Sequence, residues 1–470
     1  MRVTLIRVPS VPALCRWKHL RRILVTLVVS TAMQNLYAQV STAPVLSLAD
    51  AIAMATVSNP KIALVTGQQA EAKADARSAR SALFPKLGVS ESFIDSTDPV
   101  FAFGTNLRQG RFTAQDLSLG RLNSPPATSD FASVAGGTWT VFDSGRSIHQ
   151  LRSKNTAVAA AQLQTVATKQ NISYAVVRDY YRALLADQEK LTSAAAVARA
   201  ASFAKQAHDR VDAGTALESD AMQADIDLSQ RTQEAAEALS NAKLAYADLA
   251  GTLGTPSKTF ALIKPEGNPE PMKSSPDELQ ALALRRRPDL QAARLQIAAA
   301  QEGFKSSRAA LGPQLSTFAN VEADNPHLTS GGSTNWTVGA KVEVQLFDGG
   351  TRRAQMDNAT AKREIAEARY KQAEIEAGVE VKRSYYALQT AQAQYAISAD
   401  MLHKTQQTLQ TSLDRYNAGL VTITEVLRQQ DQLRYMELHR AETLYQWWIA
   451  DAQLRLAVGD ESSTVQGVHP

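Results

Sequence analysis

The chain has 470 residues, of which 44% are hydrophobic but only 6% aromatic, a balance that suits long helices packed through small side chains. Its formal net charge is +4, but the first 38 residues contain six basic side chains and no Asp or Glu. Without them the rest of the chain carries about −2, so its charge gives no reason to expect a nucleic-acid partner.

Residues 1–38 have the pattern of a secretory signal. A basic start is followed by a short apolar run at 23–29 and by a small residue, Ala38, after which we expect cleavage. The run is too short to span a bilayer, and a short membrane anchor is the alternative interpretation. The one cysteine, Cys15, precedes the apolar run and would be removed, which leaves no disulfide or cysteine metal site in the mature chain.

The chain contains an internal repeat in two registers. At a spacing of 228 residues Pro60 matches Pro288 and Pro85 matches Pro313, and at least nine further positions are identical. At a spacing of 205 residues a second set of turns and helix ends matches: 142–146 with 347–352, 210–214 with 415–419, and Gly254 with Gly459. The 23 extra residues of the first unit therefore lie between Pro85 and position 142, and we expect them to form a loop. Chance similarity between Ala-rich helices would scatter such matches.

Each unit is predicted to begin with a helix that a proline interrupts. The first runs over 48–80 with a break at Pro60, and the second over 277–308 with a break at Pro288, because proline removes a helical hydrogen bond and clashes with the preceding turn. Pro85 and Pro313 then end these helices.

A β-hairpin follows in each unit. Residues 336–346 alternate between apolar and polar side chains over about eleven positions, the length of a tilted membrane-spanning strand. The partner strand is predicted at 315–322, and the first unit supplies strands at 87–93 and about 133–142. One such hairpin could belong to a soluble domain; two in an exported chain favour a membrane location.

Two very long helices come next. They are predicted over 145–212 and 351–417, each on the order of 100 Å long, with Asp of the preceding turn as N-cap and Gly214 or Gly419 at the end. Return helices run to about Ala250 and Leu456. Small apolar residues form more than one stripe along these helices, which indicates neighbours on both sides, as in a wall of helices; a loosely patterned bundle core is the alternative.

These elements define the expected organisation of the chain: signal peptide 1–38, first repeat 39–254, a linker rich in Pro, Ser and Lys at 255–276, second repeat 277–459 and a flexible tail at 460–470. Four strands cannot close a membrane barrel, since the smallest closed barrels need about eight. An open edge in lipid would leave backbone groups unpaired. If the hairpins lie in the membrane, several chains must therefore share one barrel.

The sequence resembles the TolC family of outer-membrane factors over nearly the whole mature chain. The resemblance is carried by the doubled Phe-Asp-(Ser/Gly)-Gly turns, by Arg-Tyr-Asn-Ala-Gly-Leu-Val-Thr-Ile-Thr-Glu-Val at 415–426 and by Leu-Phe-Pro-Lys-Leu at 83–87. It implies a mostly α fold with transmembrane β-structure: a trimer in which four strands from each chain build a twelve-stranded barrel, continued by a helical periplasmic tunnel. It also implies an outer-membrane location, and an inner-membrane pump and a periplasmic adaptor as partners, with no cofactor.

The resemblance points to functional residues only at the tip of the second unit. In TolC-like channels a tyrosine just before the tip glycine helps to hold the aperture shut, and Tyr416 stands there; a carboxylate six residues after the glycine lines the constriction, and Glu425 matches. Such a ring of acids would bind cations. The family pattern has a second acid one turn later and an arginine two residues after the glycine, where this chain has Arg428 and Val421. Arg428 could therefore neutralise Glu425. Alternatively, Glu425 is only a first-turn acid that the helix dipole favours.

The turns at the two helix ends are expected to contact the adaptor, unless they are plain hairpin turns. Their residues are Gly214, Thr215, Ala216, Leu217, Gly419, Leu420, Val421 and Thr422.

The predicted function is a passive outer-membrane conduit for efflux of small molecules such as drugs or metals. A channel for type I protein secretion is the alternative, and a soluble periplasmic coiled-coil scaffold is a second one. An enzyme is not expected, because the seven histidines show no metal-ligand spacing and no nucleophile or paired-acid motif stands out.

Overall fold

The computed structural model describes residues 44–256, 260–264, 267, 274–328 and 331–460. The predicted signal with Cys15, most of the tail and parts of the linker lie outside these residues. Two compact units are present. The smaller comprises β1 (Val45–Leu46) and part of β4 (Ala261–Leu262), which pair as a two-stranded sheet. All other described elements belong to the larger unit.

The helices of the two repeats have equal lengths. In each, an 11-residue helix leads into a 22-residue helix, and a 67-residue helix leads into a 36-residue return helix. The first repeat contains α2 (Leu48–Ser58), α3 (Pro60–Ser81), α6 (Arg146–Asp212) and α7 (Glu218–Leu253), and the second α8 (Pro276–Arg286), α9 (Pro288–Ala309), α10 (Thr351–Asn417) and α11 (Ile423–Val458). The spacing of 228 thus holds for both ends of the 11- and 22-residue helices, and the spacing of 205 for both ends of the 67- and 36-residue helices.

A shared joint connects the proline break to the end of the return helix. In the first repeat the Asn59 Nδ2 atom donates to the Thr252 carbonyl at 2.7 Å, and in the second the Arg287 Nη1 atom donates to the Ala457 carbonyl at 3.2 Å. The four residues match one another in the two registers. Two different side chains therefore satisfy the same orphan carbonyl in the last turn of a helix.

Glycine completes this joint. Gly254 ends α7 with φ +75°, and a Cβ atom there would lie 2.5 Å from the Ser58 carbonyl oxygen. Gly459 ends α11 with φ +77°, and a Cβ atom there would lie 3.0 Å from the Arg287 nitrogen. Only glycine meets both demands, a left-handed conformation and close approach of another backbone.

The Phe-Asp turns start the long helices, but the aspartates are not the N-cap residues that the sequence predicted. The N-caps are Gly145 and Gly350, both left-handed with φ of 87° and 89°. Each aspartate lies two residues before the N-cap glycine, and its carboxylate accepts a hydrogen bond from the first turn of the helix. Asp143 Oδ2 accepts from the Ser147 N–H at 2.8 Å, and Asp348 Oδ2 accepts from the Arg352 N–H at 3.0 Å. Glycine therefore makes the bend while aspartate satisfies the first-turn donor.

One antiparallel sheet holds the four long strands in the order β2–β3–β5–β6. They are β2 (Lys86–Ser96), β3 (Thr128–Phe142), β5 (Gln314–Asn325) and β6 (Ser333–Glu343). The hairpins were predicted, but β6 begins and ends three residues before the predicted 336–346. The last pair is Gln314 with Glu343, and Pro313, which has no N–H to donate, stops the ladder there.

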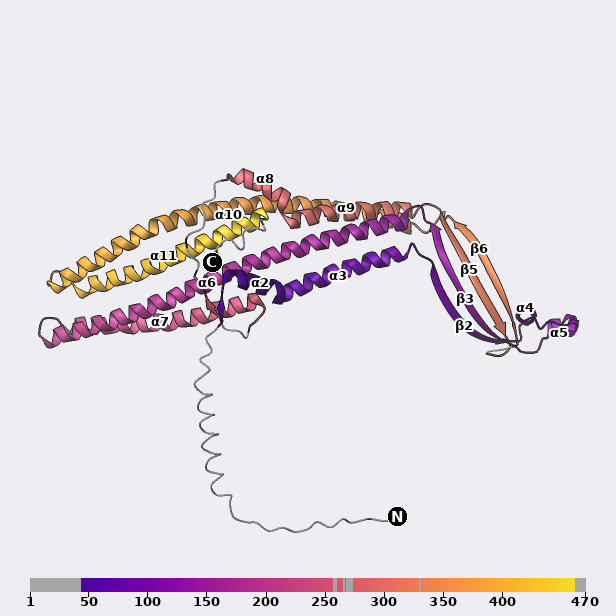
Figure 1. Cartoon of the computed structure of the whole chain (residues 1–470), viewed down its shortest axis with the longest axis horizontal. Coiled ribbons are helices and arrows are strands. Elements are labelled where there is room, and N and C mark those ends of the chain that lie inside the picture. The colour runs from indigo at the N-terminus through magenta and orange to yellow at the C-terminus, as the bar shows by residue number, and fades with distance from the viewer. Residues whose placement is uncertain (1–43, 257–259, 265–266, 268–273, 329–330, 461–470) are drawn as a thin grey trace, which may run out of the picture. The chain divides into compact units, whose positions relative to one another are not determined.

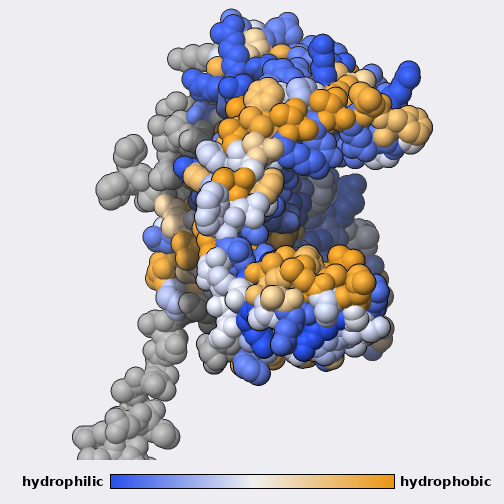
Figure 2. Space-filling view, turned by 90° about the vertical axis from the view of Figure 1, so that its right-hand side faces the viewer, coloured by the Kyte–Doolittle hydropathy of each residue, from blue (hydrophilic) through white to orange (hydrophobic). Residues whose placement is uncertain are grey.

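The register separates an apolar from a polar face. Directly opposed pairs share a face, and Val89–Ala135, Ala135–Val321 and Val321–Trp336 place apolar side chains on the same face in all four strands. The other face carries most of the charged residues, Lys86, Asp130, Glu322, Asp324, Lys341 and Glu343, while Glu91 and Asp95 of β2 lie on the largely apolar face. Figure 2 looks onto the strand end of the chain and shows hydrophobic residues gathered in exposed patches there.

The extra residues of the first repeat are not the plain loop that the sequence predicted. They form α4 (Pro99–Arg108), the 3₁₀ turn η1 (Ala114–Leu117) and α5 (Leu119–Asn123) between β2 and β3 (Figure 1). Asp98 starts α4, because its Oδ1 atom accepts from the Phe101 N–H at 2.7 Å and Pro99 fits the first helical position.

Helices of the two repeats lie side by side. The helices α3, α6, α9 and α10 contact one another in that order, and α7 and α11 fold back along α6 and α10 (Figure 1). The return helix α11 also packs on α6, so the two helical hairpins touch. No single helix in the described residues is long and apolar enough to cross a membrane, whereas α2 and α3 meet that test together, bent by 46°.

We expect Gly254→Ala to destabilise the protein by a few kcal/mol, since it forces alanine into the left-handed region and against the Ser58 carbonyl. Gly251→Ala is the matched control one turn earlier: it lies within α7 with nothing within 4 Å of its added methyl. It should raise stability by up to about 1 kcal/mol through helix propensity. Thermal unfolding of the purified protein in detergent measures both, and equal midpoints for the two variants would contradict this account of the joint.

Candidate functional site

The predicted tip residues lie at the two helical hairpin ends. One turn joins α6 to α7 at 213–217 and the other joins α10 to α11 at 418–422. Gly214 and Gly419 follow the long helices with φ of 70° and 74°, as predicted for helix-ending glycines. All eight predicted turn residues are exposed or half-buried, and Leu217 and Leu420 are 70% and 68% exposed. Apolar side chains are thus open to solvent at both turns.

Tyr416 connects the two hairpins of the chain. It lies in the last turn of α10, is 7% exposed, and packs with its ring centroid 5.8 Å from that of Phe203 in α6. The Arg210 guanidinium, also in α6, lies over the same ring at 4.7 Å. Such a partly buried cation–π contact contributes on the order of 1 kcal/mol. The Tyr416 hydroxyl has no hydrogen-bond partner among the described residues.

A hydrophobic cluster surrounds this contact. Its buried members come from all four helices of the tip: Phe203, Ala204, Ala207, Ala221, Ala224, Leu409, Tyr416, Ile423, Val426 and Leu433. Many of them are alanines, which let the helix backbones approach closely. In this state the ends of the two hairpins are therefore packed against each other.

Glu425 and Arg428 form an ion pair one turn apart on α11. The Arg428 Nη2 atom lies 2.7 Å and 3.0 Å from the two carboxylate oxygens, and Gln429 Nε2 donates to the same carboxylate at 3.0 Å. The hydrogen bonds from Gln429 and Arg428 hold the pKa of Glu425 below its ordinary value. The geometry thus brings Glu425 and Arg428 together, while Tyr416 makes its contacts with α6.

A second connection between the hairpins, centred on Arg231, was not predicted from the sequence. Arg231 of α7 is 6% exposed and pairs with Asp227 at 3.0 Å, with Glu234 at 2.7 Å and with Asp431 of α11. Arg434 of α11 approaches Glu234 at 3.4 Å. We call these five residues the Arg231 cluster. Burial alone would lower the pKa of Arg231, but the hydrogen bond and charge of Asp227, with Asp431 and Glu234, raise it above its usual range.

Part of this cluster had a signal in the sequence. Asp227, Arg231 and Glu234 follow i, i+4 and i, i+3 spacing on one helix, which predicts a helical ion-pair set. The partners on α11 lie about 200 residues away in the chain. The spacing of these residues in the sequence does not show that α7 and α11 come into contact at Arg231.

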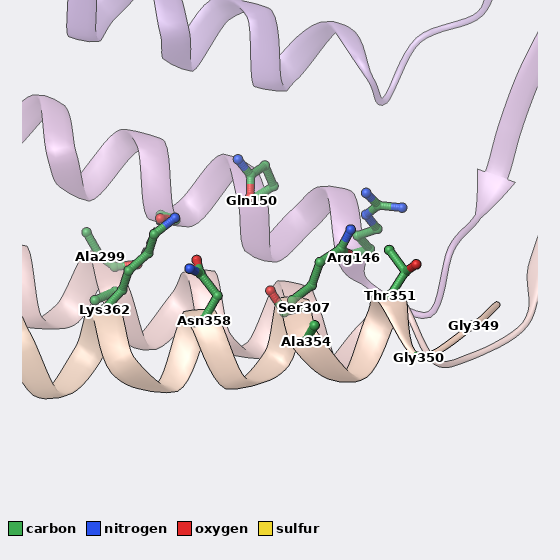
Figure 3. A pocket seen from close by; sticks show the side chains of 15 residues that line it. Arg146, Gln150, Ala299, Ser307, Gly349, Gly350, Thr351, Ala354, Asn358 and Lys362 are labelled. Atoms are coloured by element: carbon green, nitrogen blue, oxygen red, sulfur yellow. Dashed lines mark hydrogen bonds between the residues drawn. The ribbon is translucent and has the colours of Figure 1, made fainter.

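A groove of about 1000 Å³ lies at the start of the long helices, far along the chain from the tip residues (Figure 3). It is lined by α6, α9 and α10, with Arg146 and Lys362 as its charged residues. None of its lining residues is a histidine, cysteine or carboxylate, and none is a predicted site residue. Within the described part of the chain, no group of three or more such residues could hold a metal ion.

Comparison with protein families gives a match over both repeats. The family model described as outer membrane efflux protein matches residues 51–255 and 279–460. These segments cover most of the chain, and the gap between them falls at the predicted linker.

Curated relatives resemble the chain to different extents. Protein CyaE of Bordetella pertussis is 28% identical over 71% of each chain. The putative multidrug resistance outer membrane protein MdtQ of Escherichia coli is 27% identical over about half of each chain. The pyoverdine export outer membrane protein OpmQ of Pseudomonas aeruginosa is 31% identical over 40% of this chain and 37% of its own.

Solved structures show the same fold. A crystal structure of CusC superposes with a TM-score of 0.76 at 19% identity, covering 88% of this chain and 92% of CusC. The outer membrane protein VceC of Vibrio cholerae superposes with a TM-score of 0.73 at 20% identity, covering 88% and 96%. These are TolC-family channels, so the predicted fold class is confirmed.

The family match, the efflux proteins among the relatives and the channel fold agree on one identity. The chain belongs to the outer membrane efflux protein family and is a subunit of an outer-membrane efflux channel with a periplasmic helical domain.

Proposed function

We propose that three copies of this chain close one twelve-stranded barrel, and that their helices continue as a periplasmic tunnel. The observation that carries the proposal is the open sheet: β2 and β6 are its outermost strands, and each has one side without a strand partner among the described residues. In lipid these N–H and C=O groups must be paired. Strand β2 runs away from the helices and β6 runs back toward them, so β2 of one copy fits antiparallel against β6 of the next.

The two sheet faces support the same arrangement. In a membrane barrel the apolar face meets lipid and the polar face lines the interior. With this orientation, the interior of the proposed barrel carries the charged residues of the polar face and offers a water-filled path. The chain would then work as a passive conduit that needs no cofactor.

We propose further that the tip contacts hold the periplasmic end of this conduit closed. Tyr416 with Phe203 and Arg210, and the Arg231 cluster, tie the α10–α11 hairpin to the α6–α7 hairpin. Opening would require the hairpins to separate and these contacts to break. Glu425 is paired with Arg428, so the two side chains together add little net charge to the aperture.

The exposed turns are the proposed contact for a periplasmic adaptor, which would link the channel to an inner-membrane pump. Leu217 and Leu420 supply apolar side chains at both hairpin ends, where a partner could bury them. A small molecule is the proposed substrate class, because the names of MdtQ and OpmQ refer to multidrug resistance and to pyoverdine export.

Cross-linking of the sheet edges tests the shared barrel. The mature chain has no cysteine if the signal is removed, so Ser90→Cys in β2 can be combined in turn with Thr337→Cys, Gly339→Cys or Lys341→Cys in β6. These positions share the polar face, and at least one pair should oxidise to a covalent trimer on a denaturing gel. In the control pair, Ser90→Cys with Val134→Cys, the two positions are directly opposed within one chain. Their disulfide should therefore form within the chain and give monomers on the gel. Monomers from every β2–β6 pair would contradict the proposal.

Removing the tip contacts should open the channel. Arg231→Ala leaves Asp227 and Asp431 without their cation and Glu234 with Arg434 alone, a loss on the order of 3–5 kcal/mol for a buried pair, and Tyr416→Ala removes the aromatic contact with α6. Both variants should raise the conductance of the purified channel in planar bilayers several-fold.

The matched control for these variants is Lys404→Ala. Lys404 is exposed, and among the described residues it pairs only along its own helix, with Asp400 at 2.7 Å, so its removal should leave the conductance unchanged. If Arg231→Ala and Tyr416→Ala conduct like the unmodified channel, the tip contacts do not hold it closed.

A further inference from the structure

The last turn of α4 is fastened to the sheet end that lies away from the long helices. Arg108 Nη1 lies 3.3 Å from Glu322 Oε1 and 3.7 Å from Asp324 Oδ1. Gln109 Nε2 donates to Asp130 Oδ1 at 3.1 Å and to the Ser129 carbonyl at 2.9 Å. Asn335 Nδ2 donates to the Arg108 carbonyl at 3.3 Å. Three strands therefore hold the end of α4.

All these strand side chains belong to the polar face. Glu322 stands directly opposite Asn335, and Asp324 stands opposite Ser333. Asp130 stands opposite Ile94, between two residues of the apolar face, Ser129 and Phe131. Since neighbours along a strand point to opposite faces, α4 reaches over the polar face and not over the apolar one.

Burial shows that this contact is close. Gln109 is 2% exposed, Asp130 is 3% exposed and Asp324 is fully buried. Arg108 and Glu322 remain partly accessible, with 44% and 25% of their side chains exposed. The helix thus covers the inner carboxylates and leaves one cation and one carboxylate at the surface.

The charges at this contact do not balance. Three carboxylates, Asp130, Glu322 and Asp324, face the single guanidinium of Arg108. Two buried oxygen atoms, Gln109 Oε1 and Asp324 Oδ1, have no hydrogen-bond donor among the described residues. Oxygen atoms left in this way accept from water or from a cation, and uncompensated carboxylates attract cations.

We propose that α4, with Arg108, Glu322 and Asp324, forms a second, charge-selective constriction at the outer end of the conduit. This inference rests on the proposed barrel, whose polar face lines the interior. Repeated in each copy, the inward-folded helix narrows the outer mouth, and the excess of carboxylates favours cations over anions there. The positive charge of Arg108 reduces this preference for cations, and its ion pairs with Glu322 and Asp324 fasten α4 to the sheet.

The test uses the full channel in planar bilayers under a gradient of potassium chloride. Glu322→Gln removes an accessible carboxylate and should lower the K⁺/Cl⁻ permeability ratio several-fold. Arg108→Gln removes the cation, and should raise the ratio and, by freeing α4, the conductance. Arg121→Gln is the matched control, because Arg121 lies in the same insertion and its ion pair, with Asp116 at 2.9 Å, is made to η1 and not to a strand.

Each variant is measured with the natural tip and in the Arg231→Ala background, so that a closed tip does not hide an outer effect. Opposite shifts for Glu322→Gln and Arg108→Gln, with no shift for Arg121→Gln, support the outer constriction. Unchanged permeability ratios in both backgrounds overturn it, although the channel still forms and conducts. If the unmodified chain neither assembles nor conducts, the shared barrel fails instead.

Discussion

The backbone groups along the outer sides of β2 and β6 decide how this chain can work. In the proposed barrel the apolar face of the four-stranded sheet lies against lipid, yet lipid offers no partner to an open strand edge. Pairing with another copy resolves both demands. It also places the polar face inside, which makes a path through the membrane and gives α4 an interior to fold into. In this proposal the assembly of the barrel, the conducting path and the outer constriction all depend on pairing the edges of β2 and β6 between copies.

The repeats keep a common scaffold and differ where the function lies. The joint at the proline break is conserved in geometry between them, although Asn59 makes it in one and Arg287 in the other. At the tip the symmetry is lost: Tyr416 corresponds to Val211, and Arg231 corresponds to Met436. Among the residues that tie the hairpins together, Arg210 matches Arg415, whereas Phe203, Tyr416 and the Arg231 cluster have no like residues in the other repeat. The tip can therefore be asymmetric while the helices above it match in length.

Much of the fold could be predicted because prolines and glycines mark its boundaries. Pro60 and Pro288 begin helices, and the two registers fix the ends of the rest. Alternation alone extended the last strand to 346, because it cannot show that Pro313 on the partner ends the ladder. The Arg231 cluster was not predicted, because its members on α7 and those on α11 lie about 200 residues apart in the chain. Nor does composition show that the insertion contains a helix capped by Asp98, which folds onto the polar face.

The mass of the mature protein in mild detergent, corrected for bound detergent by light scattering, tests the shared barrel most directly. A particle of three chains from the outer-membrane fraction is the result that this account predicts. A stable single chain in detergent, with the edges of β2 and β6 unpaired, would contradict it.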